Sequence, residues 1–257
     1  FDIQDVGVRF YTYLSTLHYA MEASSRTNKK IIILDRPNPN SFYIDGPVLE
    51  VENSSFIGLH QVPIVYGMTI GEYGKMINGE GWLENKIKAD LEVIRIKNYN
   101  HNLKYEPPVR PSPNLPNLQS IYLYPSLALL EKTEVSIGRG TKIQFQIYGH
   151  PDFMSDFSFT PMPNFGSQYP KLNGKLSFGE DLRNYKTKNR IELKWLIKSF
   201  NLINDKTKFF RSDFDKLSGT SNLKKQIVDG ISESSIRESW KDDLEKFTKI
   251  RKKYLLY

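Results

Sequence analysis

The 257-residue sequence contains no cysteine, and this absence excludes several kinds of chemistry. Disulfide bonds, thiolate nucleophiles and cysteine-ligated metal sites are all ruled out. Cysteine-free proteins occur in oxidising and in reducing compartments, so the absence by itself assigns no cellular location.

Long apolar runs are lacking as well. No stretch approaches the roughly 20 consecutive apolar residues that a membrane-spanning helix needs. No secretory leader is visible, but the chain begins at Phe1, inside a pattern of alternating apolar and polar residues. We therefore expect that an N-terminal portion, together with any leader it contained, is missing.

Common catalytic motifs are also absent. The four histidines, at positions 18, 60, 101 and 150, show no close spacing of the kind that binds a metal ion. No Gly-x-Ser-x-Gly motif is present, which argues against an esterase-type serine. We expect neither a metal nor an organic cofactor.

The sequence is basic and aromatic. Its formal net charge is +7, but the positive residues are spread along the chain, and those near its end follow a helical pattern. A solvated helix face explains that pattern better than a nucleic-acid site. The 15 tyrosines and 15 phenylalanines suit stacking on sugar rings, although filling a core is their more common role.

The beginning of the chain predicts an α/β fold with a parallel sheet. Residues 1–4 alternate like half a strand, and Phe10, Leu14, Leu17 and Met21 then form one apolar face of a helix. The wholly apolar run Ile31–Leu34 follows and is typical of a strand buried on both faces. The order strand, helix, strand is typical of a βαβ unit.

The remaining pattern predicts a second domain. Thr69 and Glu72 have capping-box spacing at the start of a helix over 68–78, and five prolines make 105–117 a loop. Further predicted elements are strands over 91–96, 121–130 and 143–147, a helix over 191–200, and a long helix over 236–254 that begins at a capping box of Ser235 and Glu238. We expect residues 1–47 to be the remnant of a doubly wound α/β domain and residues 48–257 to form an α+β domain.

Polar residues follow both predicted parallel strands, where ligands bind in open sheets of this kind. Gln4, Asp5, Arg9 and Tyr11 follow the first strand, and Asp35, Arg36 and Asn38 follow the second. Carboxylate, guanidinium, amide and phenol groups together suit binding a sugar and polarising its glycosidic bond. The alternative is that Asp5 and Asp35 only cap helices and turns.

A second candidate site is Gly138-Arg139-Gly140-Thr141, where flanking glycines allow a tight turn that leaves the arginine accessible. Glu131 lies shortly before it and is either a further site carboxylate or an ordinary surface charge. The alternative for Arg139 is simple solvation.

Several motifs in fixed order resemble the NamZ-type exo-β-N-acetylmuramidase family, and the resemblance covers essentially the whole chain. They are residues 1–7 (FDIQDVG), 9–13 (RFYTY), 34–39 (LDRPNP), 45–50 (DGPVLE), 67–72 (GMTIGE), 111–116 (PSPNLP), 136–141 (SIGRGT) and 250–257 (IRKKYLLY).

The resemblance implies removal of terminal N-acetylmuramic acid from the non-reducing end of peptidoglycan fragments. It implies a Rossmann-like domain joined to a smaller one, with the site in a cleft between them. The family's presumed catalytic glutamate belongs to a Pro-Glu-His-Gly motif upstream of the residues present. Of its catalytic set, Tyr11 remains, with Asp2, Gln4, Asp5 and Arg9 beside it.

Muramic acid carries a lactyl carboxylate, so its pocket should contain a cation. Arg9, Arg36 and Arg139 are the candidates, and we expect at least two of them to face one cleft. The competing hypotheses are a non-catalytic protein that binds peptidoglycan, and one part of a split hydrolase whose missing segment is a separate chain. A peptidoglycan substrate implies a periplasmic or secreted protein.

Overall fold

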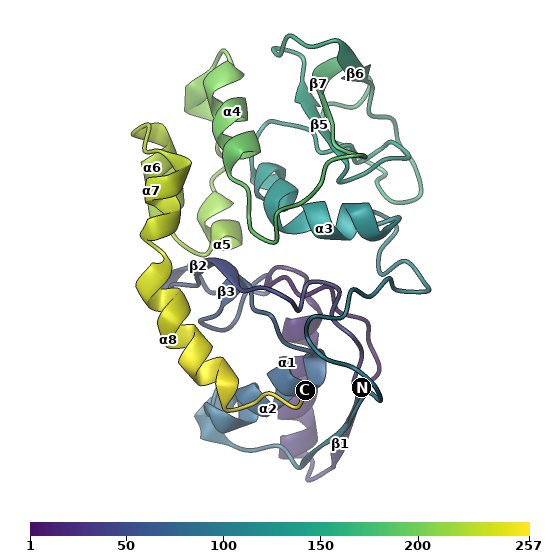
Figure 1. The fold of residues 1–257 in the computed structure, drawn as a ribbon, viewed down its shortest axis with the longest axis vertical. Helices are drawn as coiled ribbons and strands as arrows, with labels where there is room; N and C mark the ends of the chain where they lie inside the picture. Colours follow the sequence, from purple (N-terminus) through teal and green to yellow (C-terminus); the bar gives the residue numbers. More distant parts are fainter. The chain divides into compact units, whose positions relative to one another are not determined.

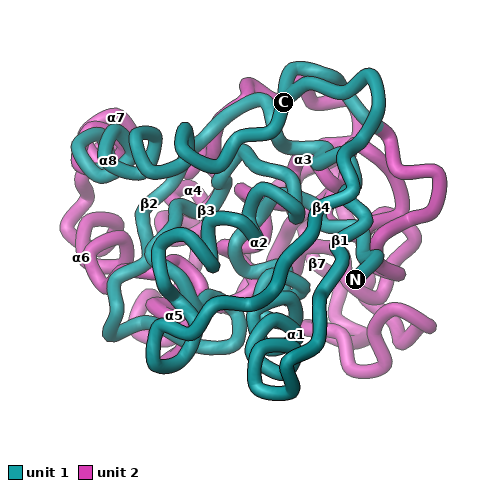
Figure 2. Tube along the Cα trace, turned by 90° about the horizontal axis from the view of Figure 1, so that it is seen from below, with its two compact units in different colours: residues 1–105, 240–257 teal, residues 106–239 magenta.

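The computed structural model describes all residues, 1–257, and the fold is of the α/β class (Figure 1). Contacts divide the chain into two compact units (Figure 2). Unit 1 comprises residues 1–105 and 240–257, and unit 2 comprises residues 106–239. The boundary predicted between residues 47 and 48 lies inside unit 1, because residues 48–105 pack with residues 1–47. None of the helices has the length and apolar character of a membrane span.

Unit 1 contains a parallel strand pair with helices against it. Strand β1 (Ile31–Leu34) pairs in parallel with β4 (Leu91–Ile94), and the connection between them includes α2 (Ile70–Gly79). A second pair, β2 (Asp45–Val48) and β3 (Pro63–Val65), is antiparallel. A parallel sheet was predicted, but between residues 1–4 and Ile31–Leu34, whereas the partner of β1 is β4, whose residues were assigned to the second domain. Strand β1 was also expected to be buried on both faces, and instead Ile32 and Leu34 are more than 40% exposed.

The N-terminal segment does not form the predicted strand. Only Phe1 bonds to β1 through its main chain: its amino group donates to Ile32 O (2.7 Å), and its carbonyl accepts from Leu34 N (2.9 Å). The chain turns further on at Gly7, whose φ of +77° favours glycine.

Helices of unit 1 pack their apolar faces into one core. The predicted first helix is confirmed as α1 (Tyr13–Arg26), with Leu14, Leu17 and Met21 buried. The predicted capping box of α2 is also confirmed, since Thr69 accepts from Glu72 N and the Glu72 carboxylate accepts from Thr69 N. Helix α8 (Lys241–Lys252) contributes Phe247 to the same core.

The long helix predicted over 236–254 is in fact two helices. Helix α7 (Glu233–Glu238) belongs to unit 2, and the chain passes through Ser239 and Trp240 into α8 of unit 1. The N-cap of α7 is Ser232, whose hydroxyl accepts from Ser235 N, so the predicted cap at Ser235 is wrong. Apolar spacing continues across the break because each helix separately buries one face.

Unit 2 contains a three-stranded antiparallel sheet and several short helices. The strand order is β5 (Ile147–His150), β7 (Ser177–Asp181), β6 (Phe157–Phe159). Its helices, besides α7, are α3 (Leu118–Leu127), α4 (Lys194–Leu202), α5 (Phe214–Ser218) and α6 (Asn222–Val228). The loop predicted over 105–117 is confirmed, and α4 confirms the helix predicted near 191–200.

Two predicted strands of unit 2 are wrong. Residues 121–130 belong to α3 and the 3-10 turn that follows, because Asn117 and Ser120 form a capping box at the start of the helix. A fully apolar run does not distinguish a buried strand from a buried helix. Residues 143–146 form a turn in which Phe145 has a φ of +55°, and strand pairing begins only at Ile147.

Candidate functional site

The structure brings the two predicted groups of polar residues in unit 1 together. Arg36 Nε donates to Asp2 Oδ1 at 2.6 Å, and both side chains are partly exposed. Gln4 Nε2 donates to the main-chain oxygens of Asp5 and Pro37, each at 2.8 Å. The segment after Phe1 and the loop after β1 therefore form one polar surface.

Asp5 lies beneath this surface and is only 3% exposed. Its Oδ2 accepts from Gly7 N at 2.7 Å and from the Tyr66 hydroxyl, while Oδ1 has no hydrogen-bond partner. Burial raises the pKa of the Asp5 carboxyl to about 6, although both hydrogen bonds act in the opposite direction. A carboxyl group held in this way changes its charge near neutral pH.

Tyr11 is partly exposed and lies within electrostatic reach of Asp5. Burial raises the pKa of the Tyr11 phenol, and the charge of Asp5 raises it further. The ring of Tyr13 packs edge-on against that of Tyr11, with centroids 5.2 Å apart. Tyr11 therefore keeps its proton at neutral pH, and its hydroxyl can donate a hydrogen bond.

Arg9 is buried and joins two segments of unit 1 by hydrogen bonds. Its guanidinium is 1% exposed and donates to Pro47 O (2.9 Å) and Val62 O (2.7 Å), the carbonyls of two separate segments. Burial lowers the pKa of Arg9 to about 9, so the group remains charged at neutral pH. The expectation that Arg9 faces a cleft is not met, since these carbonyls hold it inside the unit.

Asp35 and Asn38 hold the loop after β1 in place. Asp35 accepts from Thr69 Oγ1 (2.7 Å), Gly71 N (2.8 Å) and the Tyr257 hydroxyl (2.7 Å). These bonds join the N-terminus of α2 and the end of the chain, and the carboxylate complements the helix dipole. Asn38 Nδ2 donates to Met68 O at 2.8 Å, and Oδ1 accepts from Asn40 N.

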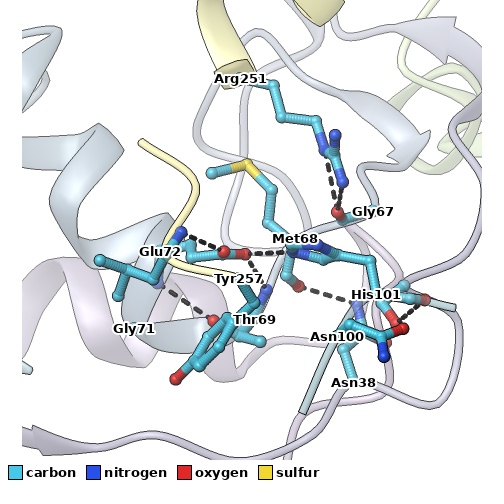
Figure 3. Close-up of polar contacts among 12 residues, drawn as sticks. Asn38, Gly67, Met68, Thr69, Gly71, Glu72, Asn100, His101, Arg251 and Tyr257 are labelled. Atoms are coloured by element: carbon cyan, nitrogen blue, oxygen red, sulfur yellow. Dashed lines mark hydrogen bonds and ion pairs between the residues drawn. The ribbon is translucent and has the colours of Figure 1, made fainter. Parts of the chain in front are cut away.

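Glu72, His101 and Arg251 form a neighbouring network to which the sequence predictions gave no binding role (Figure 3). Glu72 is fully buried and accepts from His101 Nε2 (2.9 Å) and Leu256 N (2.7 Å). Arg251 Nε donates to Gly67 O at 2.9 Å. The motifs at 67–72 and 250–257 contain most of these residues and were the available signal. The spacing of residues within these motifs did not predict the network, because it joins segments 184 residues apart in the sequence.

This network borders a pocket of about 340 Å³ in unit 1. Residues 41–44, His101, Asn102 and Arg251 line it. The pocket therefore offers an imidazole and a guanidinium that the network already holds in place.

The remaining predicted residues, Glu131 and Arg139, form an ion pair in unit 2. The Arg139 guanidinium also lies over the Phe145 ring, 5.0 Å from its centroid. Gly138 and Gly140 have φ values of +78° and +81°, as the predicted tight turn requires. No group of three or more metal-ligating side chains occurs in the chain.

Two family models match the chain. "Exo-beta-N-acetylmuramidase NamZ, N-terminal" matches residues 1–119, and the C-terminal model of the same family matches residues 122–257.

The chain is also similar to the peptidoglycan β-N-acetylmuramidase NamZ of Bacillus subtilis (strain 168), with 36% identity over 282 aligned residues. The alignment covers all of this chain, which spans 66% of the length of that relative.

Two crystal structures of DUF1343 family proteins from Bacteroides fragilis NCTC 9343 share the fold. The first is 46% identical, with a TM-score of 0.97, and covers 99% of this chain and 74% of that protein. The second is 26% identical, with a TM-score of 0.85, and covers 99% and 73%. Together with the family models along both units, these similarities show that the chain belongs to the exo-β-N-acetylmuramidase NamZ family.

Proposed function

We propose that this chain is part of a glycoside hydrolase that removes N-acetylmuramic acid from the non-reducing end of peptidoglycan fragments. The match of both units to the NamZ family, whose B. subtilis relative is named a peptidoglycan β-N-acetylmuramidase, carries the proposal. A cell-wall substrate agrees with a periplasmic or secreted location. We further propose that β1, β4 and their helices belong to a Rossmann-like domain.

Tyr11 is the group that we propose to contact the sugar at the reacting bond. It is partly exposed and protonated, whereas Asp5 is buried beside it. Asp5 then acts through the electric field at Tyr11, which depends on its own protonation near pH 6. Asp2, Gln4 and Arg36 form the adjoining polar surface, and Asp35 and Asn38 position it.

A carboxylic acid from outside residues 1–257 completes the proposed site. The cation for the lactyl carboxylate is then Arg36 or Arg139, each of which is partly exposed in its own unit. Both already have a carboxylate partner, so an incoming lactyl group has to replace that partner or share the cation.

The test is hydrolysis of a chromogenic N-acetylmuramic acid glycoside by residues 1–257 alone and by a longer form with the upstream segment. Activity of the longer form alone would support an external acid. Binding of muramic acid without hydrolysis by either form would replace the enzyme proposal with a binding protein.

In the active form, Tyr11→Phe should lower kcat/KM by about 10²-fold or more, because the hydroxyl that we propose to contact the sugar at the reacting bond is lost. The matched control is Tyr13→Phe, which removes a hydroxyl from the packed neighbouring ring. We expect the control to retain activity and both variants to unfold at the wild-type temperature. A large loss in Tyr13→Phe with normal activity in Tyr11→Phe would reverse the assignment.

A further inference from the structure

Unit 2 contains a pocket of about 420 Å³ that has no part in the proposed reaction. Helix α4, the 3-10 turn Lys206–Lys208 with the residues after it, and helix α6 form its walls. The side chains that line it are those of Phe200, Lys206, Thr207, Phe210, Lys224 and Val228. Ligand pockets typically measure about 300–1,000 Å³ and have mostly apolar or aromatic walls, so this pocket has the size and character of a small-molecule site.

Two phenylalanine rings form the apolar wall of the pocket. Phe200 is buried and Phe210 is half-buried, and their rings stack with centroids 5.7 Å apart. Behind them, Phe210 packs edge-on against Phe209 and Phe214, and Val228 of α6 adds an exposed apolar side chain at the rim. Aromatic rings gain from packing against other rings beyond the burial of apolar area. The wall therefore favours a ligand with an aromatic ring.

The backbone around these rings is already fixed. Asp205 Oδ1 accepts from Thr207 N at 3.1 Å and caps the 3-10 turn. Phe210 forms an antiparallel bridge with Thr133, which lies in a distant segment of the same unit. A ligand does not have to order these segments on binding, which lowers the entropic cost of binding.

The pocket is also positively charged. Lys206 and Lys224 each place Nζ over one of the two stacked rings, 5.3 and 6.0 Å from the ring centroids. Neither ammonium group forms an ion pair, and no acidic residue lines the pocket. The neighbouring Asp205 pairs instead with Lys208, at 3.2 Å. Both pocket cations are therefore available to an anionic ligand.

We propose that this pocket binds an aromatic carboxylate, in which a short linker joins one aromatic ring to the carboxylate. The ring packs against Phe200 and Phe210, and the carboxylate pairs with Lys206 and Lys224. The aromatic wall and the opposite charges carry the assignment. It is independent of the reaction proposed at Tyr11, which belongs to unit 1.

The test is a titration of the full ¹⁵N-labelled chain with 3-phenylpropionate, followed by the amide signals of residues 206–210 and 224–228. 3-Phenylpropionate should shift these signals. 3-Phenylpropanamide, which lacks the charge, and propionate, which lacks the ring, should each bind at least about tenfold more weakly. Equal binding of either compound, or no shift in these segments, would overturn the proposal.

A saturated analogue tests the choice of an aromatic ring. 3-Cyclohexylpropionate has the same charge and a larger apolar area, but it has no aromatic face. We expect it to bind no more tightly than 3-phenylpropionate, because the contact between aromatic rings offsets the difference in apolar area. Tighter binding of the saturated acid would overturn the assignment to an aromatic ligand.

Variants test the charges of the pocket. Lys206→Gln combined with Lys224→Gln should weaken binding of 3-phenylpropionate by about tenfold, because both ammonium groups are lost. The fold should persist, since neither ammonium group forms a hydrogen bond or ion pair. The matched control is Lys216→Gln combined with Lys225→Gln, which removes the same charge from exposed positions outside the pocket. Wild-type affinity in the pocket variant, or an equal loss in the control, would also overturn the proposal.

A second copy of the chain is the other occupant that an apolar pocket could bind. We expect the chain to sediment as a monomer at the concentrations of the titration. A dimer that Val228→Ser dissociates would show that a second copy covers the pocket, and this result would overturn the proposal. The matched control is Ile231→Ser, which changes a 40% exposed apolar side chain outside the pocket.

Discussion

Replacing Lys171 with methionine should lower the free energy of unfolding by about 3–5 kcal/mol. The three N–H groups of its ammonium are shared among four main-chain oxygens, those of Leu130, Glu131, Thr133 and Val135, at 2.5–3.1 Å. The first two of these carbonyls, Leu130 O and Glu131 O, belong to the last turn of the 3-10 helix Ala128–Lys132, and Leu130 O also accepts from Thr133 N. Methionine has similar length but no donor, so Glu131 O, Thr133 O and Val135 O would lose this donor, whereas Leu130 O would keep its bonds from Thr133.

This loss should also reach the Glu131–Arg139 ion pair, since Lys171 holds the chain on both sides of it. The measurement is urea denaturation of the full chain, with Lys175→Met as the control. Lys175 lies in the same segment, is exposed, and makes no hydrogen bond through its ammonium group. A difference between the two variants below about 1 kcal/mol would contradict a structural role for the Lys171 ammonium.

The second large effect concerns acid stability and a buried chain of hydrogen bonds in unit 1. The Tyr73 hydroxyl contacts His60 Nδ1 at 3.0 Å, His60 Nε2 contacts His18 Nδ1 at 3.0 Å, and His18 Nε2 contacts Glu22 at 3.2 Å. Because a carboxylate only accepts, each imidazole has its proton on Nε2 and the Tyr73 hydroxyl donates. Trp82 stacks on His60, with centroids 4.6 Å apart.

Burial, together with the smaller effect of the neighbouring His18, lowers the pKa of His60 to about 3. In the unfolded chain a histidine titrates near 6.5. The neutral His60 therefore contributes stability that is fully present above pH 6.5 and is lost as the pH falls towards 3. In that pH range, His60 alone changes the free energy of unfolding by up to about 1.4 kcal/mol per pH unit.

Between pH 6.5 and pH 4, the free energy of unfolding of His60→Gln should consequently fall by about 3 kcal/mol less than that of the wild type. Its stability at pH 7 should already be lower, so the slope against pH is the decisive quantity. Parallel slopes for the two proteins would contradict the assignment.

Asp5 serves as a control, because its effect on stability against pH is opposite in sign to that of His60. Its pKa is raised to about 6, so its contribution is fully present below its unfolded pKa of 3.8 and is lost as the pH rises through 6. Asp5→Asn should therefore make acid destabilisation steeper, whereas His60→Gln makes it shallower. The surface carboxylates are the same in the wild type, His60→Gln and Asp5→Asn. Opposite changes in the pH dependence of the two variants would therefore assign those changes to His60 and Asp5.

Local sequence patterns determined the elements whose signals lie within a few residues. The apolar spacing of α1 and the Thr69–Glu72 capping box predicted two helices correctly, because both signals act within a few helical turns. The strand at Ile31–Leu34 was also predicted, as was the approach of the segment after Phe1 to the loop at Asp35–Asn38.

Tertiary structure decided what local patterns leave open. The apolar run at 121–130 is compatible with a strand or a helix, and the capping box at Asn117 favours the helix. The spacing over 236–254 continues across Ser239 and Trp240, although each half packs in a different unit. Arg9 resembles a ligand-binding cation in the sequence, and only the fold brings Pro47 O and Val62 O to it. Burial and long-range partners arise from contacts between distant segments, which residue order alone does not specify.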